Sequence, residues 1–191
     1  DGCKRRLSDD TRTALEWMRK HIDGGTVRQL AFRSASIPLL QNASRSMMPV
    51  DLVLWDPVLS GKALVNAWEA QHLRQLNEAG RYPFVAATPE SCDLLGFELD
   101  PAFLPALASF SAADFVLPAG SRVRIVAWQV GAELEAYVQE QQQYGVDIEV
   151  WKLDPPDQPD WEDTEKFEDQ VFPRRSTVRL AEFLKEQRPW S

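Results

Sequence analysis

The chain has 191 residues, of which 44% are hydrophobic and 26% charged, so it has the composition of a globular domain and not of a disordered protein. Its net charge is -8, with +4 in residues 1–50 and -12 in the rest, which argues against a nucleic-acid-binding protein because phosphate contacts need clustered Lys and Arg. No apolar run reaches the ~18 residues of a membrane span and no signal-peptide pattern is visible, so we expect a cytoplasmic protein.

Predicted helices and short apolar strands alternate along the chain. In chain order we expect a helix from the N-cap candidates Ser8–Asp10 to Gly24-Gly25, a strand over 26–32, a helix over 36–46, a strand over 50–55, a helix over 62–78, a strand over 122–128, a helix over 133–144, a strand over 147–153 and a helix over 174–187. Among the tryptophans, Trp17, Trp55 and Trp128 are expected on core faces.

This alternation is typical of right-handed crossovers on a parallel sheet. We therefore predict an α/β fold with about four parallel strands and helices on both faces, in a single partial domain over residues 1–191. The five prolines of residues 81–118 favour a cap or lid insertion there, with an irregular backbone. Residues 154–170 are predicted to form an acidic loop.

A candidate site lies at Arg33–Ser36, where a predicted strand meets a predicted helix. Ligands of open α/β sheets bind beyond the carboxyl ends of the strands. The small residues here suit the tight turn of a nucleophile elbow, whose usual pattern is Gly-x-Ser-x-Gly. The alignment Ala31–Ala35 puts Arg33 at the nucleophile position, and Phe32–Ser36 puts Ser34 there. An ordinary strand–helix junction is the third interpretation.

Three segments carry a family resemblance: Leu15–Met18, Val27–Leu40 and, most specifically, Leu52–Gly61 with its Trp-Asp-Pro-Val-Leu-Ser-Gly end. They resemble the α/β-hydrolase superfamily and, more narrowly, the bacterial exosortase-A-system-associated hydrolases; Pro155–Glu165 is similar less closely. The resemblance covers most of the chain and is weakest over 81–118. It implies a partial α/β-hydrolase fold with acyl or ester hydrolase ancestry, either as the carboxy-terminal portion of a longer protein or as a reduced relative.

The resemblance also implies a catalytic order of Ser, then Asp or Glu, then His. Ser34 is the candidate nucleophile and Glu133 the candidate acid. The chain has 2 histidines, His21 and His72, and neither lies after the third predicted strand, 122–128. Without a base, the Ser34 hydroxyl stays protonated and is a poor nucleophile, so we expect no assembled triad and little or no hydrolysis. His21 suits a helix end and His72 a solvent-facing helix position.

The ligand-binding candidates are Arg33, Ser34 and Asp56, and the expected partner is a small acyl or anionic ligand. A planar guanidinium suits a carboxylate or phosphate, and we expect that of Arg33 at the carboxyl end of the sheet, near Asp56 or Glu133 or lining a pocket. No cofactor or metal is expected. The acidic segment Asp154–Asp169 lacks the spacing of a calcium loop, and the 2 cysteines form no zinc motif.

A second interpretation is a non-catalytic interaction or ligand-binding protein that uses the hydrolase-like half-sheet. The predicted strand 26–32 would then leave one edge of the sheet exposed. Long apolar edges template association, so we expect self-association through this edge.

Overall fold

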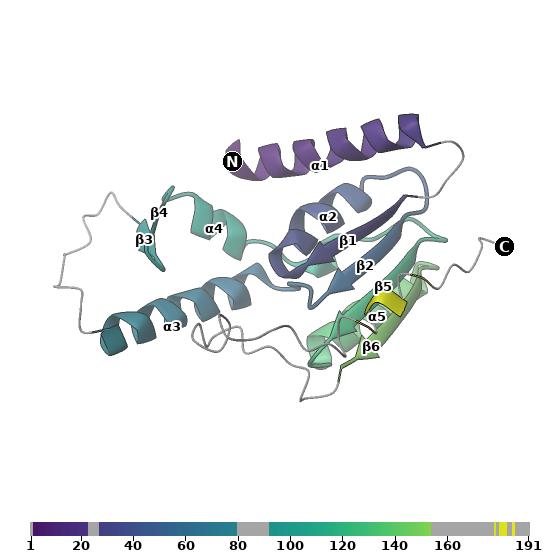
Figure 1. Ribbon diagram of the computed structural model, residues 1–191. Helices are drawn as coiled ribbons and strands as arrows, with labels where there is room; N and C mark the ends of the chain where they lie inside the picture. The colour runs from purple at the N-terminus through teal and green to yellow at the C-terminus, as the bar shows by residue number, and fades with distance from the viewer. Residues whose placement is uncertain are drawn as a thin grey trace.

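The computed structural model describes residues 2–22, 27–79 and 92–153, together with the helical residues 178, 180–182 and 185. Four strands form one parallel sheet in the order β1-β2-β5-β6 (Figure 1). These strands are β1 (Arg28–Phe32), β2 (Asp51–Trp55), β5 (Arg122–Ala127) and β6 (Asp147–Lys152). The predicted α/β class with a four-stranded parallel sheet is confirmed.

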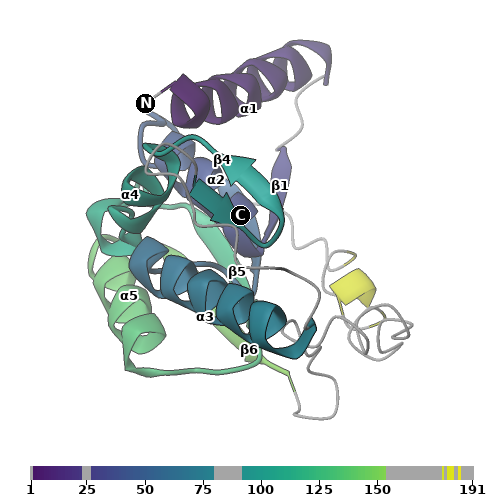
Figure 2. The same ribbon diagram turned by 90° about the vertical axis from the view of Figure 1, so that its left-hand side faces the viewer.

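Three crossover helices cover one face of this sheet. The strand order rises without a reversal, and right-handed crossovers then put the connecting helices on the same side. Figure 2 shows these helices on one side of the sheet and the helical residues near the carboxyl end on the other. The helices and the smaller elements are α1 (Gly2–His21), η1 (Arg33–Ala35), α2 (Ser36–Ala43), α3 (Gly61–Ala79), β3 (Cys92–Leu94), β4 (Phe97–Leu99), α4 (Phe103–Ala108), η2 (Ala112–Asp114) and α5 (Ala132–Gln143).

Side chains of the central strands alternate between two hydrophobic cores. Leu52 and Leu54 of β2 point into the larger core, which α2, α3 and α5 cover. Val53 points to the opposite face and into a smaller core with Val126 and Leu180. Both faces of β2 are therefore buried, which explains why its sequence is an apolar run without alternation.

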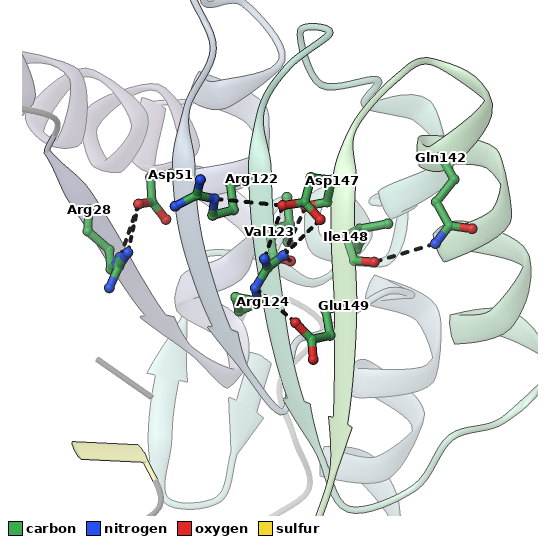
Figure 3. Close-up of polar contacts among 9 residues, drawn as sticks. All are labelled: Arg28, Asp51, Arg122, Val123, Arg124, Gln142, Asp147, Ile148 and Glu149. Atoms are coloured by element: carbon green, nitrogen blue, oxygen red, sulfur yellow. Dashed lines mark hydrogen bonds and ion pairs between the residues drawn. The ribbon is translucent and has the colours of Figure 1, made fainter. Parts of the chain in front are cut away.

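The amino-terminal half of the second face is charged (Figure 3). Basic and acidic residues alternate from strand to strand, because Arg28 of β1 pairs with Asp51 of β2 at 3.0 Å and Arg124 of β5 pairs with Asp147 of β6 at 3.0 Å. Arg124 also reaches Glu149 at 3.2 Å. Opposite charges on neighbouring strands favour this register, because a one-residue slip would turn them to the other face.

Residues 92–118 are more regular than predicted. A hairpin of β3 and β4 is followed by α4 and η2, and Leu107, Phe110 and Leu117 are buried in the larger core. The Gly61 N–H donates to the Phe110 carbonyl at 2.9 Å, so this segment is tied to the start of α3. A lid function for residues 81–118 stays a prediction, and residues 80–91 lie outside the described residues.

Several local expectations were wrong. Helix α1 begins at Gly2, and Ser8–Asp10 lie inside it, because the preceding residues include good helix formers and no breaker beyond Gly2. Trp17 is 60% exposed and belongs to no core. Helix α2 ends at Ala43, where the Ser44 hydroxyl donates to the Gln41 carbonyl and competes with further helical bonds. Within the described ranges, no helix is long and apolar enough to cross a membrane.

Candidate functional site

The first residues after β1 and β2 form an ion pair at the carboxyl end of the sheet. Arg33 Nη1 lies 2.6 Å from Asp56 Oδ2, and both side chains are half-buried. Both residues have left-handed backbones, with φ of 46° and 45°. Such conformations are costly for residues other than glycine and gather at functional sites. The expected place of Arg33, near Asp56 at this edge, is confirmed.

Ser36 fastens this turn to the neighbouring strand end. Its fully buried hydroxyl donates to the Arg33 carbonyl at 2.6 Å and accepts the Val58 N–H at 3.0 Å. The sequence suggested only that a small residue was needed here. Serine hydroxyls often bond to nearby backbone carbonyls, so a serine at this strand-to-helix junction is a signal for a local hydrogen bond.

The elbow-like backbone is centred on Arg33. Of the two alignments, Ala31–Ala35 therefore puts the left-handed residue at its centre. Ser34 follows in η1 with an exposed side chain, and its hydroxyl has no hydrogen-bond partner within the described part of the chain. No side chain in the described ranges is hydrogen-bonded to this hydroxyl as a base that could remove its proton.

Neither histidine is hydrogen-bonded to Ser34. His21 is exposed at the end of α1, as expected, where its ring stacks on Trp17 and its Nδ1–H donates to the Trp17 carbonyl at 2.7 Å. His72 is half-buried, so the expected solvent-facing position was wrong. Its Nδ1 accepts the Leu95 N–H at 3.0 Å and ties the β3–β4 hairpin to α3.

Glu133 forms no hydrogen bond or ion pair with Arg33 or Asp56 in the described part of the chain. It is exposed in the first turn of α5, where a carboxylate suits the helix dipole. Its carboxylate forms no hydrogen bond or ion pair with another described residue. The structure therefore brings Arg33 and Ser34, which follow β1, to the same edge of the sheet as Asp56, which follows β2, but joins Glu133 to none of them by a hydrogen bond or ion pair within the described residues.

A cavity of about 470 Å³ opens beside Ser34. Its volume lies within the ~300–1,000 Å³ of small-molecule sites, which are apolar with a few polar groups. Thr11, Ser34 and Gln41 supply the polar side chains here. The remaining lining residues come from β1, η1, α2, α3 and α4: Leu30, Ala31, Ala35, Ile37, Pro38, Leu39, Trp68, Phe103 and Leu107.

No cluster of three or more His, Cys, Asp or Glu side chains in the described ranges is arranged to hold a metal ion. The acidic loop predicted over residues 154–170 lies outside those ranges. The polar groups that the structure brings together at the turns after β1 and β2 are the Arg33 guanidinium, the Asp56 carboxylate and the Ser36 hydroxyl, with the Ser34 hydroxyl beside them.

Comparisons of the chain with protein-family models, with curated proteins and with solved structures found no match.

Proposed function

We propose that this protein binds a small acyl or similarly apolar ligand in the cavity beside Ser34 and does not hydrolyse it. The observation that carries the proposal is the cavity itself, which has the volume of a ligand site and abuts the strand-to-helix turn at the carboxyl end of the sheet. Trp68 and Phe103 offer broad apolar surfaces, and Ser34 and Thr11 offer hydroxyls that fix an orientation.

The lack of catalysis follows from the surroundings of Ser34. Acyl transfer needs a nucleophile with a base in hydrogen-bond reach, and the described surroundings of the Ser34 hydroxyl contain neither an imidazole nor a carboxylate bonded to it. The resemblance to exosortase-associated hydrolases supports an acyl or ester hydrolase ancestry with a degenerate elbow in a bacterial, cytoplasmic protein. Ligand binding is the part of such a function that survives without a triad.

An anionic head group is the second element of the proposal. Arg33 precedes Ser34, which lines the cavity, but is not itself a lining residue, and its guanidinium turns toward Asp56 across the strand ends. A guanidinium can bind a second carboxylate while it keeps its first partner, because it has five N–H donors. We therefore favour a ligand with an apolar chain and a carboxylate.

Titration with dodecanoate, followed by tryptophan fluorescence and by calorimetry, tests the proposal. We expect saturable one-to-one binding. Ala35→Phe, which fills the cavity from η1, should weaken binding about tenfold or more. Ala136→Phe, at an exposed position of α5 that does not line the cavity, is the matched control and should bind as the parent does.

Two results would contradict the proposal. Binding that is absent, or that Ala35→Phe leaves unchanged, removes the cavity as the ligand site. Stoichiometric labelling by a fluorophosphonate that Ser34→Ala abolishes would show an activated serine and restore the hydrolase alternative. Replacement of dodecanoate by dodecan-1-ol tests only the head group, because the alcohol keeps the chain and lacks the carboxylate.

A non-catalytic interaction protein is the second candidate function. The observation that favours it is the exposed apolar surface along β1, the last strand on its side of the sheet in the described part of the chain.

A further inference from the structure

We infer that β1 is the contact surface for a second copy of this chain, and that two β1 strands pair antiparallel about Leu30. The starting observation is the exposure of this strand. Within the described residues β1 pairs only with β2, and Leu30 is 52% exposed and Phe32 36% exposed. The Phe32 ring packs edge-on against Trp55, with centroids 5.4 Å apart, and still presents its outer side.

The two edges of the sheet differ in their exposed charged residues, which oppose the addition of another strand. The other edge strand, β6, exposes the charged residues Asp147, Glu149 and Lys152. Exposed charges are a common means of preventing edge-to-edge pairing. Strand β1 has one charged residue, Arg28, whose side chain is 26% exposed, against 60% for Asp147 and 67% for Glu149, although Arg124 pairs with both of those. The β1 edge therefore lacks the protection that β6 has.

Helix α1 extends the same surface. Thr11 and Leu15 are half-buried, and Met18 and Ile22 continue this stripe at helical spacing but are exposed. These two residues are exposed because the carboxyl end of α1 projects past α2 (Figures 1 and 2). An added strand beside β1 would lie next to this overhang and cover the end of the stripe.

A second copy fits this surface because β1 complements itself. With a twofold axis through Leu30, the five residues of β1 oppose Leu30 to its own copy and Arg28 to Phe32 of the other copy. No like charges are opposed in this pairing. The exposed surface of Met18, Ile22, Leu30 and Phe32 is on the order of 300 Å² per copy, less than half of the ~800 Å² that each partner of a stable dimer buries. The main chain of the two edges and the flanking side chains contribute the rest.

The test is sedimentation velocity of the full chain over a range of concentrations. We expect the mass of two chains at high concentration and of one chain on dilution. Leu30→Lys places a charge at the centre of the edge and should weaken self-association roughly tenfold or more. Leu73→Lys is the control, because Leu73 is 59% exposed on α3 and lies off the proposed contact.

Hydrogen exchange locates the contact independently of the variants. We expect slower exchange of the β1 amides at dimer-forming concentrations, with no such change in β6. A chain that stays monomeric, a dimer that Leu30→Lys leaves intact, or protection confined to β6 would each overturn the inference. If the protein is monomeric in solution, β1 contacts either a different partner or none, and both results contradict the inferred pairing with a second copy.

Discussion

Arg33 and Asp56 stabilise each other in conformations that neither would adopt alone. A left-handed backbone costs a residue with a side chain on the order of 1–3 kcal/mol. The 2.6 Å ion pair, the Ser36 hydroxyl bonded to the Arg33 carbonyl, and the Asp56 N–H bonded to Val126 hold the two turns in place. This fixed geometry sets the position of Ser34 at the mouth of the proposed ligand site.

Tyr137 gives a test of how burial acts on a single group. Its hydroxyl is buried in α5 without a hydrogen-bond partner in the described ranges, and burial, assisted by the charge of Glu140, raises the pKa of Tyr137 above its usual value of 10.0. Tyr137→Phe removes an unsatisfied polar atom, so we expect the free energy of unfolding at neutral pH to rise by about 1 kcal/mol.

The same variant has a predictable pH dependence. Because the pKa of Tyr137 is raised in the folded state, the unfolded chain loses this proton first as the pH passes 10.0. The parent should therefore lose about 1 kcal/mol of stability between pH 10 and 11, and Tyr137→Phe should not lose this part. Urea unfolding at pH 7, 10 and 11 measures the difference. Tyr144→Phe, at an exposed position, is the control, and an equal pH dependence in both variants would contradict the prediction.

At the residue scale, the sequence predicted what depends on neighbours in the chain. Arg33 and Asp56 each follow an apolar strand, and parallel strands end at the same edge, so their meeting was predictable. The role of His72 was not, because its partner is the Leu95 N–H in a hairpin far along the chain. No local pattern distinguishes such a histidine from one that faces solvent.

At the scale of elements, the start of α3 depends on close backbone contact with α4. A Cβ atom placed on Gly61 would lie 1.8 Å from the Leu107 carbonyl oxygen, and 3.1 Å from Phe110 Cβ. The nearest neighbour is main chain, which cannot rotate away as a side chain could. The glycine at the end of the Leu52–Gly61 segment is therefore required for packing.

We expect Gly61→Ala to lower the free energy of unfolding by about 2–4 kcal/mol, because α4 must shift away from α3. Chemical denaturation followed by circular dichroism measures this loss. Gly131→Ala is the control: Gly131 precedes α5, and a Cβ there meets nothing within 4 Å. Equal stability of the two variants would show that α4 moves at little cost.

The elements that the sequence predicted well are those with strong apolar patterns. Strand β2 was found because a continuous apolar run is typical of a buried parallel strand. The β3–β4 hairpin was missed because its two-residue loop is Leu95-Gly96, with φ of 54° and 82°. Turns of this kind usually show Asn-Gly or Asp-Gly, and leucine at the first position gives no such signal.

At the scale of the whole molecule, one sheet supports two cores of unequal size. The larger core lies under α2, α3 and α5, and the smaller one joins Val53, Val126, Trp128 and Leu153 to Leu180 near the carboxyl end. The sequence predicted helices on both faces but could not show that the second face is charged in its amino-terminal half and apolar in its carboxyl-terminal half. That division depends on which residues share a register across four strands.

Because neighbouring residues of β2 and β5 belong to different cores, we expect the two cores to unfold together. Leu180 is 8% exposed, so Leu180→Ala should lower the free energy of unfolding of the whole chain by about 2–4 kcal/mol. Val178 is 53% exposed in the same helical region, and Val178→Ala should change stability little. Urea unfolding tests this coupling when it is followed by two signals. One is tryptophan fluorescence, to which Trp55, Trp128 and Trp151 of the smaller core contribute, and the other is far-ultraviolet circular dichroism, which reports on the helices. The two signals should change at one midpoint in the parent and in both variants.

An earlier fluorescence transition in Leu180→Ala, with the dichroism unchanged, would mean that the smaller core opens alone and that the sheet does not transmit its loss to the other face.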